Sequence, residues 1–101
     1  MGQNIPQILK KLSILIPAYN EENTIIPILK ELQKLSLHSS LEKEIIIIDD
    51  HSTDRTAELI SEFINSTPDL KINYHLQKYN QGKGAALHKA IEMATGDYII
   101  I

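Results

Sequence analysis

The sequence has no cysteine and no tryptophan, and it has a single phenylalanine. Without cysteine there is neither a disulfide framework nor a thiolate metal site, and the cytoplasm is the expected compartment. No apolar run approaches the ~20 residues that a membrane-spanning helix needs, so any membrane association is expected to be peripheral, at the cytoplasmic face. Ten basic residues against 13 acidic ones give a formal net charge of −3. The basic residues are scattered, which argues against a nucleic-acid partner.

What the chain does have is a hydrophobic content of 43% over 101 residues, enough for one domain with a modest core. We expect residues 1–11 to form a flexible leader and residues 12–101 to form the folded domain. The opening residues lack the apolar stretch of a signal peptide. Pro6 also stands where a myristoylation signal has serine or threonine.

Four segments are predicted to be strands. The apolar residues 12–16 and the four isoleucines that run into Asp49 are typical of strands buried on both faces of a parallel sheet. Residues 70–76 alternate apolar and polar side chains, which indicates an edge strand with one face in water. The segment "DYIII", residues 97–101, begins a fourth strand.

Two helices are predicted between the first three strands. The first begins at Ile25, with Asn23 or Thr24 as its N-cap, and the second follows "HSTDRT", with Ser52 or Thr53 as its N-cap. Apolar residues recur at helical spacing in both segments. For the second helix the predicted buried residues are Leu59, Ile60, Phe63 and Ile64.

A third helix is predicted over residues 85–95, with Gly96 placed to end it as the C′ residue. Its predicted inner face consists of Leu87, Ala90, Ile91 and Ala94. Strands and helices that alternate through short connections predict a three-layer α/β/α sandwich with a parallel sheet. Ligands of such sheets bind beyond the carboxyl ends of the strands. In this sequence those ends lead into residues 17–22, 49–52 and 77–83.

Asp49 and Asp50 end the strand of isoleucines, where a carboxylate must find a partner. Adjacent residues of a strand point to opposite faces, so we expect one aspartate to bind a ligand and the other to brace the turn. The alternative is that both aspartates only bond to loop amides. That alternative is stronger for Asp49 than for Asp50.

Two further residues beside these strand ends suit a nucleotide ligand. Tyr19 offers a flat apolar face for a base or ribose, and Pro17 fixes the direction in which the chain leaves the strand. Lys83 stands between two glycines before a helix, where backbone amides and a cation can receive phosphate oxygens. Ordinary packing for Tyr19 and a solvated turn for Lys83 stay open as alternatives. The glycine spacing fits neither a Walker loop nor the dinucleotide-binding pattern.

Four motifs together resemble the nucleotide-binding half of the family 2 glycosyltransferases, and are most similar to the dolichyl- and polyprenyl-phosphate mannose and glucose synthases. The motifs are "ILIPAYNEE" (14–22), "IIIIDDHSTDRT" (45–56), "NQGKGAALHKAI" (80–91) and "ATGDYIII" (94–101). They cover nearly everything after residue 11 in the order and spacing of the family. The resemblance implies the Rossmann-like N-terminal part of a GT-A glycosyltransferase fold, truncated at its C-terminus.

The resemblance also implies a nucleotide-sugar donor, linked to UDP or GDP, whose base and ribose lie against residues 17–19. Glu21 would then lie near the ribose, Asp50 would bond the base, Asp49 would support the turn, and Lys83 would lie towards the sugar or phosphates. The donor-binding residues that it implies are Pro17, Ala18, Tyr19, Glu21, Asp49, Asp50 and Lys83.

The resemblance implies that further parts of the enzyme lie outside this chain. The family's Asp-x-Asp motif, which holds Mg²⁺ or Mn²⁺, is expected just past Ile101, and the acceptor-binding half with its catalytic base is expected after that. We therefore expect no catalytic residue and no metal ligand set within the chain. His88 and Glu92 have helical i,i+4 spacing, but two ligands without a third predict a surface pair.

The implied reaction is an inverting sugar transfer, with a polyprenyl phosphate as one possible acceptor, and the isolated chain is expected to be inactive. His51 departs from the family by replacing a glycine, and histidine adopts positive φ more readily than most residues. The apolar "YIII" segment also predicts self-association through an unpaired strand edge.

Two other functions fit parts of the sequence. A nucleotide-binding or assembly module without catalysis stays open as an alternative. The paired aspartates also suggest a phospho-receiver domain, but here they follow the second strand and no acidic residue ends the third.

Overall fold

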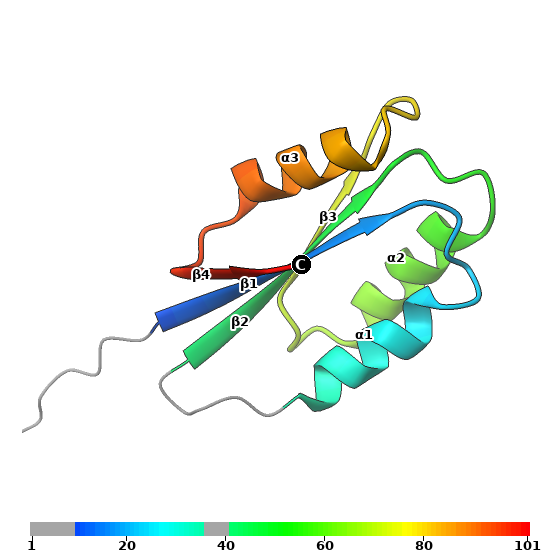
Figure 1. Cartoon of the computed structure of the whole chain (residues 1–101). Coiled ribbons are helices and arrows are strands. Elements are labelled where there is room, and N and C mark those ends of the chain that lie inside the picture. Colours follow the sequence, from blue (N-terminus) through cyan, green and yellow to red (C-terminus); the bar gives the residue numbers. More distant parts are fainter. Residues whose placement is uncertain (1–9, 36–40) are drawn as a thin grey trace, which may run out of the picture.

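The computed structural model describes residues 10–35 and 41–101, which form seven elements (Figure 1). Their order is β1 (Lys10–Ala18), α1 (Ile25–Lys34), β2 (Leu41–Asp49), α2 (Thr56–Ser66), β3 (Ile72–Leu76), α3 (Lys83–Met93) and β4 (Tyr98–Ile100). The first strand begins two residues earlier than predicted, at Lys10, and the rest of the predicted leader lies outside the described residues. In the described part of the chain, none of the helices has the length and hydrophobicity needed to span a membrane.

The four strands form one parallel sheet in the order β3-β2-β1-β4. Ile14 of β1 pairs with Ile45 of β2 on one side and with Ile100 of β4 on the other. The third strand is therefore an edge strand, as its alternating pattern predicted. The fourth lies beside the first, so the two ends of the described chain meet in the sheet.

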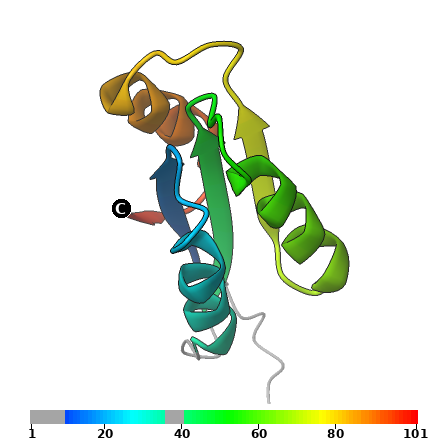
Figure 2. The same cartoon turned by 90° about the vertical axis from the view of Figure 1, so that its right-hand side faces the viewer.

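Helices cover both faces of the sheet, with α1 and α2 on one side and α3 on the other (Figure 1 and, from the side, Figure 2). The isoleucines of β2 divide between the faces because side chains alternate along a strand. Ile45 and Ile47 pack into the core under α1 and α2, whereas Ile46 and Ile48 pack against Ala86 and Ala90 of α3. The predicted three-layer α/β/α sandwich is confirmed.

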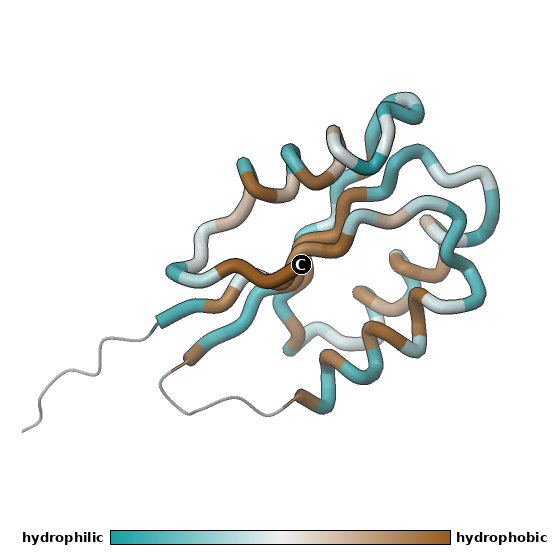
Figure 3. Tube along the Cα trace, viewed as in Figure 1, coloured by the Kyte–Doolittle hydropathy of each residue, from teal (hydrophilic) through white to brown (hydrophobic). Residues whose placement is uncertain are grey.

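Hydropathy separates the strands from the loops that follow them (Figure 3). The middle of the sheet is hydrophobic, and the loops after β1, β2 and β3 are largely hydrophilic and lie at the same end of the molecule. This is the arrangement in which the carboxyl ends of parallel strands carry the polar groups. The fold therefore brings the three predicted loops to one edge of the sheet.

The start of α2 differs from the prediction. Its N-cap is Arg55, and neither Ser52 nor Thr53 caps it. Ser52 instead donates its hydroxyl hydrogen to Asp49, while the Thr56 amide donates to the carboxylate of Asp54. The predicted apolar face is confirmed, because Ile60 and Phe63 are buried and Leu59 and Ile64 pack partly buried beside them.

The end of α3 also differs. The helix spans Lys83–Met93, and its C-cap, Ala94, is extended, so Gly96 is not the C′ residue. A Cβ atom on Gly96 would lie 2.5 Å from Ser13 Oγ and 2.8 Å from the Lys11 carbonyl oxygen. Glycine at this position therefore allows the turn before β4 to lie close against β1. On the inner face Ala86 is buried, whereas the predicted inward residue Ile91 is 47% exposed.

Candidate functional site

A pocket of about 320 Å³ opens at the carboxyl ends of β1 and β2, against the first turn of α3. The residues that line it are Pro17, Ala18, Tyr19, Glu21, Asp50, Asn80, Gly82, Lys83 and Ala86. Six of the seven residues implied as donor-binding are in this set, and Asp49 is the exception. Asn80, Gly82 and Ala86 are not among the predicted binding residues, although all three belong to the motif "NQGKGAALHKAI".

Asp50 is 4% exposed and joins two loops. Its Oδ1 atom accepts a hydrogen bond from the Gln81 amide at 2.7 Å, and its Oδ2 atom accepts one from the Gly82 amide at 2.8 Å. Gly82 has φ 95°, a backbone conformation that residues other than glycine rarely adopt. Asp50 thus holds the loop that leads into α3 while it also lines the pocket.

Asp49 points to the opposite side of the sheet and is fully buried. Its Oδ1 atom accepts bonds from the amide and hydroxyl of Ser52 at 2.8 and 2.6 Å, and its Oδ2 atom accepts one from the Tyr74 hydroxyl at 2.6 Å. Burial raises the pKa of Tyr74, and the bond to this carboxylate raises it further. Asp49 therefore braces the turn, as one of the two aspartates was expected to do.

The loop after β1 is tied to the loop after β2 at Asn20. This residue has φ 51°, which asparagine tolerates better than most residues. Its amide donates to Ser52 Oγ at 3.0 Å, and its side-chain Oδ1 atom accepts from the Thr53 amide at 2.8 Å. Ser52 also donates its hydroxyl hydrogen to Asp49. The side chain of Ser52 therefore links the buried Asp49 to the loop after β1.

The two glutamates of the first loop take different roles. The carboxylate of Glu22 accepts a bond from the Arg55 amide at 3.1 Å, so this side chain is used to hold the loops together. Glu21 donates its amide to Thr56 Oγ1 at 2.8 Å and accepts a bond from the Thr24 hydroxyl on its carboxylate at 2.7 Å. Its exposed side chain lines the pocket.

His51 has φ 62°, so the positive φ anticipated at this position is confirmed. Its ring Nδ1 atom lies 3.1 Å from the carbonyl oxygen of Gln77, to which the Nδ1–H tautomer donates. The buried Gln77 also donates its own amide to the carbonyl of Asp49 at 2.8 Å. His51 therefore links the loop after β2 to the end of β3.

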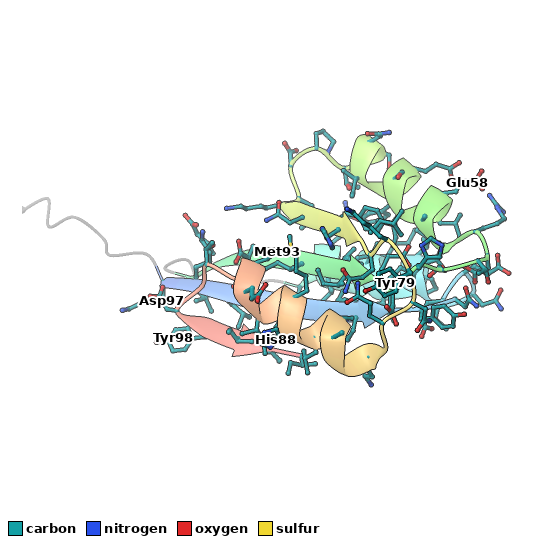
Figure 4. All side chains as sticks on the ribbon, turned by 90° about the horizontal axis from the view of Figure 1, so that it is seen from above. Glu58, Tyr79, His88, Met93, Asp97 and Tyr98 are labelled. Carbon is teal, nitrogen blue, oxygen red and sulfur yellow. The ribbon has the colours of Figure 1, made fainter. Side chains whose placement is uncertain are left out.

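A second buried carboxylate lies at the other end of β2. Glu44 is 1% exposed and accepts hydrogen bonds from Ser13 Oγ at 2.6 Å and from the Thr95 amide at 2.7 Å. Burial alone would raise the pKa of Glu44, but these bonds, with the charge of Lys11, outweigh it and leave the pKa below its ordinary value. Figure 4 shows the nearby Asp97 and Tyr98 far along the strands from Tyr79.

Glu44 is not among the site residues predicted from the sequence. A glutamate directly before four isoleucines was a signal that could have identified it, because a carboxylate flanking a buried strand needs partners.

The histidines form no metal centre in the residues that the structure describes, where no group of three His, Asp or Glu side chains is placed to hold an ion. His88 Nε2 lies 3.3 Å from Glu92 Oε1, and both side chains are exposed, which confirms the predicted surface pair. They border a wider depression of about 590 Å³ between β3 and α3, whose lining contains none of the predicted binding residues.

The profile of "Glycosyl transferase family 2" matches residues 13–101. The dolichyl-phosphate beta-glucosyltransferase of Dictyostelium discoideum is 38% identical over 97 residues, which cover 89% of this chain and 29% of the relative. The chain thus spans less than a third of this relative's length.

Solved structures of glycosyltransferases have the same fold as this chain. The mannosyltransferase PcManGT from Pyrobaculum calidifontis, in complex with GDP-Man and Mn²⁺, superposes with a TM-score of 0.83 at 26% identity, over 92% of this chain and 27% of that one. Staphylococcus aureus TarS with UDP-GlcNAc gives a TM-score of 0.77 at 28% identity, over 89% and 25%. The expected Rossmann-like part of a GT-A fold is thereby confirmed. By profile, sequence identity and fold, the chain belongs to glycosyl transferase family 2.

Proposed function

We propose that this chain forms the donor-binding part of a glycosyltransferase that takes a sugar from a UDP- or GDP-linked donor. The observation that carries the proposal is the convergence of six residues, implied by the family resemblance, on one pocket at the carboxyl edge of the sheet. The family membership supplies the reaction class, and the pocket supplies a place for the donor.

The proposed contacts follow from the chemistry of the pocket lining. Tyr19 is 44% exposed, so its ring is available to stack on a base or ribose. Asp50 presents a carboxylate to the N–H groups of a base, and Glu21 presents one to the ribose hydroxyls. Lys83 is exposed in the first turn of α3, where its charge and the helix dipole both favour phosphate. Asp49 serves indirectly, by holding the turn that carries Asp50.

The sugar acceptor is proposed to be a polyprenyl phosphate. Support comes from the name of the Dictyostelium relative, a dolichyl-phosphate glucosyltransferase. Such an acceptor is a membrane lipid, so we propose that the whole protein works at the cytoplasmic face of a membrane through peripheral contact. The acceptor site and the catalytic base are proposed to belong to the whole protein, since this chain spans about a quarter of the solved structures that it matches.

A divalent metal, Mg²⁺ or Mn²⁺, is proposed as the cofactor of the whole enzyme. PcManGT was solved with Mn²⁺, which supports this. The residues described here do not fit such an ion, because they offer no cluster of three carboxylates or histidines. No step of the proposed donor binding depends on it.

The donor site is tested by titrating the chain with UDP-glucose and GDP-mannose in a calorimeter. Tyr19→Ala is expected to weaken binding about tenfold, which corresponds to about 1.4 kcal/mol of lost stacking. His88→Ala, on the outer face of α3, is the matched control and should bind as the unmodified chain does (Figure 4). Equal affinities for all three proteins, or no binding of either donor, would contradict the proposed site.

A non-catalytic module would bind the same nucleotides, so a second measurement separates the two functions. The whole protein that contains this chain is incubated with a radiolabelled donor, polyprenyl phosphate and Mn²⁺. Metal-dependent labelling of the lipid is expected for the enzyme. Tight donor binding without any transfer to lipid or to other acceptors would favour the binding module.

We also propose that the isolated chain self-associates through β4. All three residues of this strand are exposed, and Ile99 and Ile101 are 48% and 69% accessible. An apolar strand edge favours pairing with another chain. Light scattering should show a mass that rises with concentration, and Ile99→Lys should lower it. A monomer over a wide concentration range would contradict the proposal.

A further inference from the structure

Tyr74, in the edge strand β3, is a partly buried residue outside the donor pocket. Its ring packs beside the core under α1 and α2, and it is not among the residues that line the pocket. Its hydroxyl group donates a hydrogen bond to Asp49 Oδ2 at 2.6 Å. Burial and this bond raise the pKa of Tyr74 above its ordinary value of 10.0, so the hydroxyl group keeps its proton at neutral pH and remains a donor.

The bond from Tyr74 completes the fixation of the Asp49 carboxylate. Asp49 is fully buried, and its other oxygen, Oδ1, accepts bonds from the amide and hydroxyl of Ser52 at 2.8 and 2.6 Å. The torsion that turns an aspartate carboxylate has broad minima, so bonds at one oxygen alone leave the group free to turn. Donors at both oxygens hold it in one orientation. The Tyr74 hydroxyl thus helps to determine where Asp49 holds Ser52.

Ser52 carries this constraint to the loop after β1. The Ser52 hydroxyl oxygen accepts a bond from the Asn20 amide at 3.0 Å, and Asn20 has φ 51°. Its two neighbours in sequence, Tyr19 and Glu21, both line the donor pocket. Three hydrogen bonds in series therefore join the Tyr74 hydroxyl to this wall of the pocket.

The second wall of the pocket depends on Asp49 directly, because Asp50 follows it in the chain and lines the pocket. The Asp50 amide donates to the carbonyl oxygen of Ala18 at 2.8 Å, which joins the second wall to the first. We propose, building on the proposed donor site, that Tyr74 is a positioning residue. Through the Asp49 carboxylate it holds both walls of the pocket in the geometry that binds the donor, without touching the donor itself.

A matched control lies at the other end of β2. Ser13 Oγ donates to the buried carboxylate of Glu44 at 2.6 Å, the same distance as in the bond from Tyr74 to Asp49. Tyr74→Phe and Ser13→Ala each remove one hydroxyl group from a buried carboxylate of the same strand. Both variants should therefore lose stability. Neither Ser13 nor Glu44 lines the donor pocket, so only Tyr74→Phe should lose affinity for the donor.

The first test measures the affinities of the unmodified chain and both variants for UDP-glucose and GDP-mannose by calorimetry. Sucrose is present because it favours the folded state, and circular dichroism checks folding. For the donor that the unmodified chain binds more tightly, Tyr74→Phe should weaken binding about fivefold, whereas Ser13→Ala should stay within about twofold. Unchanged affinity in Tyr74→Phe, or an equal loss in both variants, would overturn the inference. So would a Tyr74→Phe chain that stays unfolded where Ser13→Ala folds, because the hydroxyl would then be required by the fold rather than by the site.

The second test is a double-mutant cycle on the path itself. Ser52→Ala removes the hydroxyl group between Asp49 and Asn20 and should weaken donor binding at least about fivefold. If both substitutions act through Asp49, adding Tyr74→Phe to Ser52→Ala should weaken binding by no more than about a further twofold. Losses that multiply in the double variant would refute the shared path.

The outcomes also separate this inference from the proposed function. If the unmodified chain binds neither donor, the donor site itself is wrong, and the inference falls with it. If it binds a donor and Tyr74→Phe binds that donor equally well, the donor site stands and only the inference fails.

Discussion

Glu44 and Asp50 stand at the two ends of the same row of isoleucines, and a comparison of the two separates a structural carboxylate from a candidate binding one. Both are almost completely buried, and both accept hydrogen bonds from backbone amides. Asp50 lines a pocket, whereas the Glu44 carboxylate is bonded by Ser13 and Thr95 and lies 3.9 Å from the Lys71 ammonium group. Burial and bonding are thus shared by both carboxylates, and the open space beside one of them makes the difference.

The largest effect on stability is expected at Gly96, near the end of β2 that carries Glu44. Gly96→Ala places a Cβ atom against Ser13 and Lys11, where backbone atoms cannot give way, and overpacking of this kind costs about 2–3 kcal/mol. Gly84→Ala is the matched control, because it meets open space in the first turn of α3 and should change the stability by less than about 0.5 kcal/mol. Urea denaturation measures both. A Gly96→Ala variant as stable as the unmodified chain would show that the turn before β4 is not tightly held.

Glu44→Gln should cause the second largest loss of stability. An amide nitrogen would replace one acceptor oxygen and face hydroxyl and N–H donors, at a cost of about 1–3 kcal/mol. The pKa of Glu44 is lowered in the folded chain, so its stabilising contribution is present above the ordinary value of 4.5. That contribution is lost as the pH falls through the lowered pKa.

Urea melts from pH 7 down to pH 3 measure this difference. The gap in stability between the unmodified chain and Glu44→Gln should narrow below pH 4.5. A gap that is constant with pH would exclude ionised Glu44 as its source.

Asp50→Asn tests the other carboxylate of the comparison, the one that lines the pocket. Asparagine offers one acceptor oxygen to two loop amides, so the variant should bind UDP about tenfold more weakly. Glu44→Gln changes the carboxylate at the other end of the isoleucines. Its affinity for UDP should stay within about twofold of that of the unmodified chain under conditions where both variants are folded. If calorimetry gave both substitutions the same loss of affinity, the division between the two ends would be wrong.

The smallest effect is expected at His51. His51→Gly removes the bond to Gln77 but also relieves the positive φ, whereas His51→Ala removes the bond and keeps the strain. The alanine variant should therefore be about 1 kcal/mol less stable than the glycine variant. Thermal unfolding of both proteins measures this difference. Equal stabilities would mean that the backbone at this position relaxes on substitution.

The sequence allowed the fold and much of the site to be predicted where the determining interactions are local. Four isoleucines predict a strand buried on both faces, and the alternation of side chains predicts that Asp49 and Asp50 diverge. The start of α2 was missed because Ser52, although a good N-cap residue, is engaged by Asp49 and by the loop after β1. Such competition depends on residues distant in sequence.

The role of Gly96 and the identity of the partners of Glu44 could not be predicted for a related reason. A glycine near a helix end is commonly a C′ residue, and local sequence alone favours that interpretation. Its contact with Ser13, 83 residues away, exists only once β4 has paired with β1. The same pairing brings Thr95 to Glu44.

The strand order β3-β2-β1-β4 has a consequence for the chain during its synthesis. Of the four strands, β1 is made first and receives its second neighbour last, after about fifty further residues have followed β2, which takes roughly 3 to 10 seconds at ~5–20 residues per second. Over that interval one side of β1 has no partner from its own chain. Ser13 and Pro17 lie within this strand, and a polar side chain and a residue without an N–H group both disfavour pairing with a foreign strand. This protection is partial, because the edge of β1 still lacks β4, so nascent chains stalled before residue 98 should depend on chaperones more than chains in which β4 has been made.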